Sequence, residues 1–352
     1  MAKRVYAAVS GGVDSAVSAA LLKAQGHDVT GVFVKIWRPE FLECTWKEDR
    51  LDALRVCAAL DIPFREVDLS SAYQREVVDA MLADYSRGIT PNPDVRCNEK
   101  IKFGALLRWA LAESADIVAT GHYARVEERN DAFALRRAAD AAKDQSYFLY
   151  RLGQDELAHA MFPVGSLLKS RVRELARRYA LPNADRPDSQ GLCFVGDVSM
   201  RDFLSRYIPL AQGDVVDESG SVVGRHEGAA LYTIGQRHGF TAGGGGNEPH
   251  YVVGINVEKN VLQVARTRDV AACSRVALSQ LRWVGETALS QESLFAQSRY
   301  HEEPVEGILS MDASPPVFTF RRPHVVSPGQ SLVLYRGDEC LGGGIISREN
   351  LP

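Results

Sequence analysis

The sequence predicts an α/β protein with an N-terminal doubly wound parallel sheet, a small central domain and a C-terminal β-barrel. In the first third of the chain, short apolar runs alternate with segments of helical pattern, as in parallel sheets covered by helices. A glycine-rich turn joins the first run to the first helix. From about residue 200, glycine and valine become frequent, and short alternating runs stand between turn signals. We therefore expect three domains, at residues 1–198, 199–272 and 273–352.

The N-terminal elements follow from their apolar spacing. Residues 15–25 carry apolar side chains at helical spacing, and Gly26 is suited to end that helix. Because ligands bind beyond the carboxyl ends of parallel strands, the loops after Val9, Val34 and Thr120 should face one cleft. The other expected elements are strands at 4–9 and 29–37, a helix at 49–60, and strands at 62–69 and 116–120.

The rest of the chain has the pattern of short strands. Residues 213–224, 251–256 and 261–265 alternate between turn signals, and the glycines at 243–246 are typical of a flexible hairpin tip. From about Ser274 onward the pattern is again strand-like, which suits a small barrel or sandwich. This final segment contains seven arginines and no lysine.

The composition is that of an ordinary globular enzyme, with 45% hydrophobic and 24% charged residues. The net charge of −4 excludes a global basic field, so an RNA partner would have to meet local basic patches. No segment is long enough to span a bilayer, and the N-terminal apolar run is too short for a signal peptide. We therefore expect a cytoplasmic protein with no membrane partner. The candidate patches, each of which equally suits a solvated face, are Lys169, Arg171, Arg173, Arg177 and Arg178, and the pair Arg321 and Arg322.

The six cysteines form no C-x-x-C pair, which argues against zinc-finger and thioredoxin-like sites. No carboxylate cage is visible either, so we expect no metal site built by the protein alone. In a reducing compartment, cysteines are usually buried small hydrophobic residues rather than a disulfide framework. Packing is accordingly the simplest role for Cys44 and Cys57.

The turn Ser10-Gly11-Gly12-Val13-Asp14-Ser15 stands between the first strand and the first helix. Its glycines allow the backbone to approach an anion, and the helix start offers unpaired N–H groups. A Walker loop would need a lysine for the β- and γ-phosphates, and this turn has none. It therefore better suits a pyrophosphate that leaves, which indicates an adenylation. For the turn alone, a tight connection capped by serine is the alternative.

The segment TPNPDVRCNEKIKF places Cys97 three residues after Asp94. Arg96 and Lys100 nearby would favour a thiolate. The carboxylate would oppose it, unless Asp94 acts as a proton acceptor. From this segment alone, chemistry at Cys97 and a capped loop around a buried cysteine are both open.

Other polar residues stand in turns. Cys193 lies in RPDSQGLCFVG, where a cysteine packed at a strand end is the simpler interpretation. In AKDQSYFLY, Asp144 could cap a helix while Lys143 and Gln145 stay polar at its start. His122 would stand at the rim of the cleft, although a lone histidine is usually structural or simply exposed.

Together these motifs closely resemble the bacterial tRNA-specific 2-thiouridylases, the MnmA family. The loop also resembles the pyrophosphatase-type loop (PP-loop) of ATP-dependent synthetases. The resemblance implies a PP-loop ATP pyrophosphatase domain, similar to the adenine nucleotide alpha hydrolases, and a C-terminal barrel that contacts tRNA. It covers nearly the whole chain, in the order SGGVDS, GVFVKIW, TPNPDVRCNEKIKF, ATGHYAR, KDQSYFLY, FPVG, DSQGLCFVG, YTIGQR, SRYHEEP, SPGQSLVLY and CLGGGII.

The resemblance implies ATP-dependent 2-thiolation of the wobble uridine in the anticodon region of tRNA. ATP, with Mg²⁺ held mainly by its phosphates, would adenylate the C2 oxygen and release pyrophosphate, and sulfur would then displace AMP. Cys193 resembles the cysteine that receives a persulfide from a sulfur carrier protein or a cysteine desulfurase. Cys97 resembles its partner nucleophile, which implies a transient Cys97–Cys193 disulfide, and Asp94 resembles the acid/base residue.

The resemblance also implies two sets of binding residues. The ATP site would consist of Ala8, Val9, Ser10, Gly11, Gly12, Val13, Asp14, Ser15, Val34 and Gly121. The tRNA contacts would be Asn92, Pro93, Asp94, His122, Lys143, Asp144, Gln145, Arg299, Tyr300 and Gln330. Glu99 departs from this pattern, because it puts a negative charge where an RNA phosphate would come close.

Two other functions compete with this one. An ATP pyrophosphatase that amidates or ligates a small molecule would not need two cysteines. A non-catalytic nucleotide sensor could keep the glycine loop, but it would have no reason to keep Asp94, Cys97 and Cys193 together.

Overall fold

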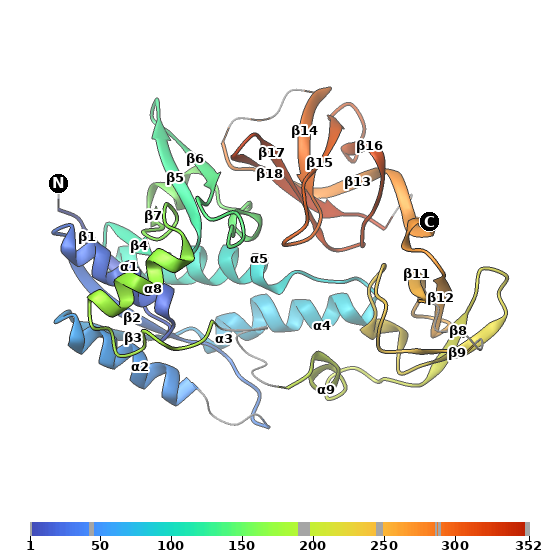
Figure 1. Ribbon diagram of the computed structural model, residues 1–352, viewed down its shortest axis with the longest axis horizontal. Helices are drawn as coiled ribbons and strands as arrows, with labels where there is room; N and C mark the ends of the chain where they lie inside the picture. Colours follow the sequence, from blue (N-terminus) through green and yellow to red (C-terminus); the bar gives the residue numbers. More distant parts are fainter. Residues whose placement is uncertain are drawn as a thin grey trace.

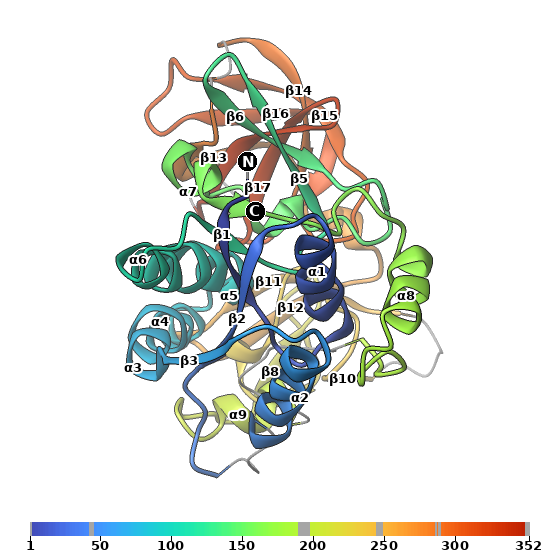
Figure 2. The same cartoon turned by 90° about the vertical axis from the view of Figure 1, so that its left-hand side faces the viewer.

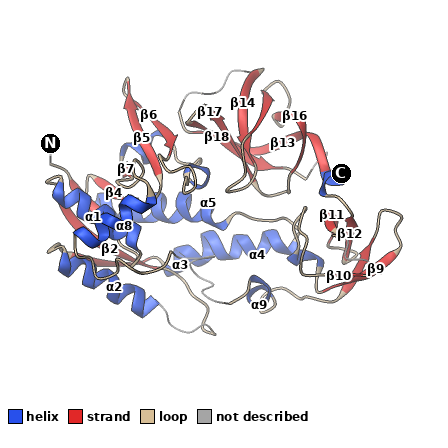
Figure 3. Cartoon of the chain, viewed as in Figure 1, coloured by secondary structure: helices blue, strands red, loops and turns tan. Residues whose placement is uncertain are grey.

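The computed structural model describes residues 2–41, 46–188, 198–243, 249–285, 287 and 290–348. The N-terminal sheet lies at one end of the molecule and two strand-rich parts lie at the other, with helical rods running between them (Figure 1). Helices are concentrated in the N-terminal half, and strands dominate the C-terminal half (Figure 3).

The N-terminal sheet is parallel throughout, with the strand order β3-β2-β1-β4-β7. The chain moves outward from β1 through β2 and β3, and then returns to the other side of β1 with β4. Ligands of such sheets bind at this switch point, beyond the carboxyl ends of β1 and β4. The strands are β1 (Arg4–Ala8), β2 (Asp28–Lys35), β3 (Phe64–Asp68), β4 (Ile117–Ala119) and β7 (Ala160–Met161).

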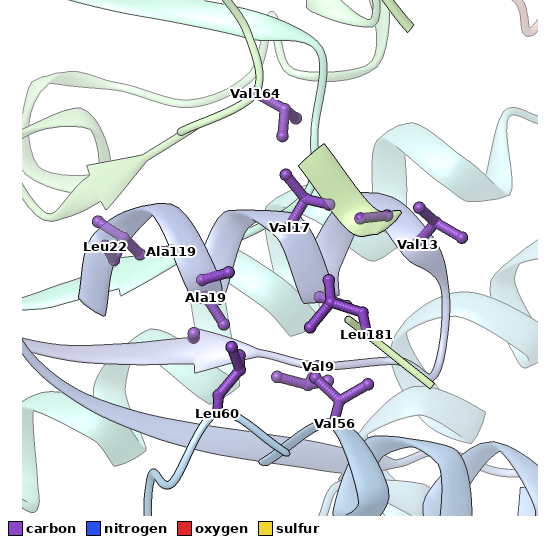
Figure 4. Packing of buried hydrophobic residues seen from close by; sticks show 14 of the residues in the cluster. Val9, Val13, Val17, Ala19, Leu22, Val56, Leu60, Ala119, Val164 and Leu181 are labelled. Atoms are coloured by element: carbon purple, nitrogen blue, oxygen red, sulfur yellow. The ribbon is translucent and has the colours of Figure 1, made fainter. Parts of the chain in front are cut away.

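Helices cover both faces of this sheet, which confirms the predicted doubly wound fold (Figure 2). Along β1, Val5 and Ala7 belong to one hydrophobic cluster, whereas Tyr6 belongs to a second cluster on the opposite face. The first cluster, whose packing is shown in Figure 4, joins the sheet to three helices, and the second joins it to α6. These helices are α1 (Val13–Ala24), α2 (Trp46–Ala59), α8 (Lys169–Arg178) and α6 (Leu107–Ala112).

Two helical rods connect β3 to β4, and Cys97 lies in the buried cluster between them. The short helix α9 (Met200–Leu204) closes this cluster from the side of the central part. The first rod consists of α3 (Ser70–Tyr73), the π-helical η1 (Gln74–Val78) and α4 (Asp79–Ser86). The second rod consists of α5 (Pro93–Cys97), the π-helical η2 (Asn98–Leu106) and α6. Two further short helices are η3 (Ser146–Phe148) and α7 (Gln154–Ala158).

The central part is a sheet in the order β10-β9-β8-β12-β11. Its strands at 213–216, 251–256 and 261–265 fall where the sequence predicted them, whereas the glycine tip at 243–246 lies largely outside the described residues. The strands are β8 (Gly213–Val216), β9 (Val222–His226), β10 (Thr241–Ala242), β11 (Tyr251–Asn256) and β12 (Val261–Ala265), with the short helices η4 (Ala229–Leu231) and η5 (Arg268–Ala271).

The C-terminal part is a closed barrel, as predicted. Its strands follow the order β13-β16-β15-β14-β17-β18, and an additional pairing between β13 and β18 joins the two ends. Buried side chains such as Leu294, Phe318 and Leu334 fill the interior. The strands are β13 (Ala272–Trp283), β14 (Glu292–Gln297), β15 (Val305–Ser310), β16 (Val317–Val325), β17 (Ser331–Arg336) and β18 (Glu339–Ile346).

A hairpin from the N-terminal half extends the barrel sheet. It consists of β5 (Ala124–Arg129) and β6 (Ala132–Arg137), and Leu135 of β6 pairs with Cys340 of β18. The local sequence does not predict this hairpin, because its partner strand lies about two hundred residues further along the chain. The domain boundaries at 198/199 and 272/273 stay predictions. The hairpin β5–β6 lies within the first predicted domain in the sequence, but it belongs to the sheet of the third predicted domain.

The predicted elements of the N-terminal sheet exist, and their ends differ from the prediction by at most three residues. Gly26 follows the end of α1 with a φ of +84°, as predicted for the residue that ends this helix. In the parts of the chain that the structure describes, no helix is both long enough and apolar enough to cross a membrane.

Candidate active site

The turn after β1 needs glycine at Gly11. The residue has a φ of +80°, in the left-handed region that side chains disfavour. A Cβ atom there would also lie 2.9 Å from the carbonyl oxygen of Asp49. The Gly11 oxygen accepts hydrogen bonds from Asn183 Nδ2 at 2.7 Å and Arg186 Nη1 at 3.3 Å. The turn is therefore held from its outer side, where Asn183 and Arg186 also line a hollow of about 400 Å³.

Helix α1 starts in this turn without a capping side chain. Gly12 is the N-cap residue, and no side chain accepts a hydrogen bond there, so the serine cap of the alternative interpretation is not formed. Ser15 Oγ instead donates to the Gly12 oxygen at 2.9 Å, and it accepts from the Ser10 N–H at 3.2 Å. An uncapped helix start presents N–H groups and the positive end of the helix dipole, both of which favour an anion.

The neighbouring strand ends lie beside this turn. Val9 N–H donates to the Val32 oxygen at 2.9 Å, and β2 continues past that point through Val34. On the other side of β1, Gly121 comes shortly after β4 and lies against the first turn of α1. A Cβ atom on it would lie 2.7 Å from the Ser15 nitrogen. The structure thus brings the predicted nucleotide residues 8–15, Val34 and Gly121 to one edge of the sheet.

The helix α5 holds Asp94 and Cys97 within five residues. Asn92 caps it by accepting a hydrogen bond from the Val95 N–H at 3.3 Å, and Pro93 occupies the first helical position. Burial raises the pKa of Asp94, and the charge of Lys102 opposes this shift. A carboxyl group with a raised pKa is suited to both accepting and returning a proton near neutral pH.

His122 is buried and engaged by protein groups. Its Nδ1 lies 2.7 Å from Thr120 Oγ1, and its Nε2 lies 3.3 Å from Lys102 Nζ. Burial, and secondly the charge of Lys102, lowers the pKa of His122 well below its usual value. Because an ammonium group only donates, Nε2 is the acceptor and Nδ1 carries the proton. The imidazole therefore links the end of β4 to the rod that carries Asp94 and Cys97.

The side chains of Asp144 and Gln145 support the turn that contains them. Buried Asp144 accepts hydrogen bonds from the Ala138 N–H and the Ser146 hydroxyl, both at 2.9 Å. Gln145 Oε1 accepts from the Tyr123 N–H at 2.9 Å. Asp144 Oδ1 also accepts from the N–H of Ser146, the first residue of η3, at 3.2 Å, so the carboxylate does bond to a helix start, although Gln145 occupies the N-cap position.

Gln330 fastens the barrel to the segment before α5. Its Nε2 donates to the carbonyl oxygens of Thr90 and Pro91, at 2.9 and 2.8 Å. Thr90 N–H in turn donates to the Pro328 oxygen at 3.1 Å. Gln330 therefore holds the residue directly before Asn92, which caps the helix of Asp94.

Arg299 and Tyr300 lie at other junctions. Arg299 Nη2 donates to the Ile234 oxygen of the central part at 2.7 Å. The ring of Tyr300 packs against Phe148 with centroids 4.5 Å apart. Burial, followed by the charges of Asp144 and Asp94, raises the pKa of Tyr300 to about 12. The charge of Asp94 thus acts on Tyr300, whereas the tRNA contact expected for Tyr300 stays a prediction.

Asp14 is paired by residues that the sequence analysis did not assign to the nucleotide site. Its carboxylate accepts hydrogen bonds from Lys169 Nζ at 2.7 and 2.8 Å and from the Tyr123 hydroxyl at 2.8 Å. The sequence placed Lys169 only in a basic patch, because no local pattern connects it to a residue 155 positions earlier. Asp188 completes the cluster and is contacted by Lys143, Lys169 and Arg173 at 2.8, 2.8 and 2.6 Å.

Other charges near the expected RNA path are paired as well. Glu99 accepts from Arg151 at 2.7 Å and pairs with Lys100 at 3.1 Å, which offsets the negative charge that departs from the family pattern. In the basic patch on α8, Lys169 and Arg173 contact Asp188. Arg171 and Arg177 form surface ion pairs with Glu174 and Asp185.

Cys193 and Cys44 lie outside the described residues, and so does the predicted Cys97–Cys193 disulfide. Their roles stay predictions. Cys57 is buried on α2, and a Cβ atom on Gly31 would lie 2.2 Å from its sulfur. Burial raises the pKa of the Cys57 thiol to about 11, which suits packing rather than thiolate chemistry.

The fold and the site are those of an α/β domain of the nucleotide-binding kind, followed by two β domains. Three family models match these parts in order. They are described as the tRNA methyl transferase HUP domain (residues 3–197), the tRNA methyl transferase PRC-barrel domain (201–266) and the Aminomethyltransferase beta-barrel domain (274–346).

Curated relatives match almost end to end. The tRNA-specific 2-thiouridylase MnmA of Nitrosomonas eutropha is 44% identical over 98% of both chains. The enzyme of the same name from Thiobacillus denitrificans is 45% identical over 98% of this chain and all of its own, and that from Bacillus subtilis is 43% identical over 97% and 94%. The chain belongs to the tRNA-specific 2-thiouridylase family. It is a tRNA-uridine 2-sulfurtransferase, as the motifs implied.

Proposed function

We propose that the enzyme uses ATP to adenylate the C2 oxygen of the wobble uridine of tRNA and then replaces that oxygen with sulfur. The observation that carries the proposal is the uncapped start of α1, in a lysine-free turn at the switch point of the sheet. Such a helix start is suited to the β- and γ-phosphates of ATP, which would leave together as pyrophosphate.

In the first step, the uracil O2 attacks the α-phosphorus of ATP. The bond to the pyrophosphate oxygen breaks, and N3 of the uracil loses its proton. Asp94 is suited to accept this proton, because it is half-buried and Lys102 stabilises its ionised form. The product is an O2-adenylated uridine whose AMP group can leave.

In the second step, a persulfide on Cys193 supplies the sulfur. The Cys97 thiolate attacks the sulfur atom attached to Cys193, which forms the Cys97–Cys193 disulfide and releases the terminal sulfur as hydrosulfide. Hydrosulfide attacks C2, and Asp94 returns its proton to N3. AMP then leaves with the C–O bonding pair as the sulfur passes its proton to the ionised Asp94, which releases it to water. A thiol reductant then restores both cysteines. The place of Cys97 one helical turn after Asp94 supports this pairing of roles.

Magnesium would accompany ATP and neutralise its phosphate charge. Within the described residues, no three His, Cys, Asp or Glu side chains gather in a way that could hold a metal ion. The hydroxyls of Ser10 and Ser15, 3.3 Å apart at the start of α1, are the side-chain oxygens suited to face the ion and the phosphates.

The partners of the reaction belong to the same proposal. A sulfur carrier protein or a cysteine desulfurase would load Cys193 in the cytoplasm. The anticodon region of tRNA would contact the turn before α5, the turn at residues 143–145 and the barrel. The proposed contacts are Asn92, Pro93, Asp94, His122, Lys143, Asp144, Gln145, Arg299, Tyr300 and Gln330.

Product analysis tests the adenylation. With unmodified tRNA and a sulfide source, we expect one pyrophosphate and one AMP for each 2-thiouridine formed, and no pyrophosphate without tRNA. ADP and phosphate as the products would contradict the proposed role of the loop.

A cysteine substitution tests the sulfur step. Cys193→Ser should abolish 2-thiouridine in tRNA from a complemented deletion strain, as measured by nucleoside mass spectrometry, and should leave ATP binding unchanged. Cys57→Ser is the matched control, because Cys57 packs inside the fold and should not affect the reaction. Normal 2-thiouridine in the Cys193 variant would reject the persulfide assignment.

A further inference from the structure

The proposed nucleotide loop contains a carboxylate. Asp14 occupies the first turn of α1, at the helix start that would receive the phosphates of ATP. A carboxylate in the first turn stabilises a helix through its dipole, but it repels a second anion bound at the same place. The loop can accept a polyphosphate only if this negative charge is cancelled.

Lys169 is placed to cancel this charge. It begins α8, far along the chain from the loop, and its amine contacts both carboxylate oxygens of Asp14 at 2.7 and 2.8 Å. Only 15% of its side chain is exposed, so solvent screens the pair less than it screens a surface ion pair. The amine also lies 2.8 Å from Asp188 Oδ1, which holds it at this position from a second side.

Tyr123 contacts both members of the Asp14–Lys169 pair. Its hydroxyl donates to Asp14 Oδ1 at 2.8 Å, and its ring centroid lies 5.8 Å from the Lys169 amine. The backbone of Tyr123 is in turn fastened to Gln145. Asp14 is thereby held by one cation and one neutral donor, both from outside the loop.

We propose that Lys169 is a positioning residue of the nucleotide site, which neutralises Asp14 and so allows the loop at residues 10–15 to bind the phosphates of ATP. The inference rests on the proposed use of ATP at this loop. The loop itself has no lysine, and in this proposal Lys169 of α8 supplies the missing positive charge. Lys169 acts on the carboxylate of Asp14 and does not contact the phosphates.

Nucleotide binding measured by calorimetry, with EDTA present to remove divalent cations, tests this role without catalysis. Lys169→Met should weaken ATP binding by about tenfold or more, because an unpaired carboxylate then faces the phosphates. Arg177→Ala on the same helix should bind ATP like the wild type, since Arg177 pairs with Asp185 at the surface. Equal ATP affinity in Lys169→Met and the wild type would overturn the proposal.

Double variants identify the carboxylate responsible. Asp14→Asn combined with Lys169→Met should regain most of the lost affinity, because the repelling charge is gone. Asp188→Asn with Lys169→Met should not, although it removes the other carboxylate that Lys169 contacts. A lysine that contacts the phosphates directly would leave both double variants weak, and this result would overturn neutralisation as the role of Lys169.

Two further measurements separate the possible failures. Thermal unfolding of each variant shows whether it folds, and rescue by Asp14→Asn cannot occur in a chain that does not fold. If the wild type binds ATP neither in EDTA nor with Mg²⁺ present, the proposed function fails, and the role of Lys169 fails with it.

Discussion

At the scale of single residues, surroundings rather than residue type decide what the polar groups of the site can do. The charge of Lys102 acts on two of them. It partly offsets the rise in the pKa of Asp94 that burial causes, and it adds to the lowering of the pKa of His122. Asp94 is thereby suited to exchanging protons, whereas His122 stays neutral with both ring nitrogens engaged. His122 is thus better placed to organise the site than to act as an acid.

The buried imidazole makes stability depend on pH. Because the folded pKa of His122 is lowered, its stabilising effect is present above the ordinary pKa of 6.5 and is lost as the pH falls below it. Between pH 7.5 and 5.5, we expect the wild type to lose up to about 1.4 kcal/mol more unfolding free energy than His122→Gln. Urea unfolding at the two pH values measures this difference.

A second histidine variant is the control for this measurement. His238 is exposed, so His238→Gln should keep the pH dependence of the wild type. An unchanged pH dependence in His122→Gln would show that His122 contributes no such linkage.

At the scale of elements, the site depends on close approach between strand ends and the start of α1. Gly11 allows the turn, and Gly121 allows β4 to lie directly against the first turn of the helix. Both glycines are needed because backbone atoms, which cannot rotate away, would lie within 3 Å of a Cβ atom at either position. The helix start is therefore positioned by two neighbouring strands at once.

A methyl group at Gly121 should disturb this arrangement. In Gly121→Ala the new Cβ would lie 2.7 Å from the Ser15 nitrogen, so β4 or α1 must move. We expect about 1–3 kcal/mol of lost stability and at least about tenfold weaker ATP binding. Thermal unfolding and calorimetry measure the two effects.

Gly285→Ala provides the comparison. There the nearest atom to a new Cβ would be 3.4 Å away, so the variant should bind ATP like the wild type. If Gly121→Ala also binds ATP normally, the loop does not depend on the close approach of β4.

At the scale of the whole molecule, the barrel is attached to the N-terminal half by several separate contacts. Gln330 bonds to the turn before α5, and the hairpin β5–β6 continues the barrel sheet through Leu135 and Cys340. Asp338 adds ion pairs to Arg125 and Arg136 of that hairpin. Under the proposed function, a barrel held in this way would fix the position of a bound tRNA relative to Asp94 and Cys97.

Cutting one attachment should separate RNA positioning from nucleotide binding. Gln330→Ala removes two hydrogen bonds to the turn at Thr90 and Pro91. We expect kcat/KM for tRNA to fall by about tenfold, which corresponds to about 1.4 kcal/mol, while ATP affinity stays unchanged. Steady-state thiolation kinetics and calorimetry provide the two values.

Thr319→Ala is the matched change on the exposed side of the barrel and should leave both values unchanged. A parallel loss of ATP affinity in Gln330→Ala would mean that this contact supports the nucleotide site rather than the docking of tRNA.

The local sequence was sufficient to predict the elements and the kind of chemistry. Strands and helices of the N-terminal sheet follow from apolar spacing, and the turn at 10–15 follows from Gly11, whose backbone conformation other residues disfavour. The order of motifs along the chain indicated the family, and the full-length relatives confirm it. These features could be predicted because each depends on residues close together in the chain.

Only the tertiary structure decided which distant residues complete the site. Lys169 reaches Asp14 across 155 positions, and Gln330 reaches Thr90 across 240. The sequence also left the sheet partner of β6 open, since β18 lies in the last part of the chain. An ion pair or a strand pairing between such residues leaves no periodic pattern in the sequence. The fold creates these contacts by bringing segments that are far apart in the chain next to one another.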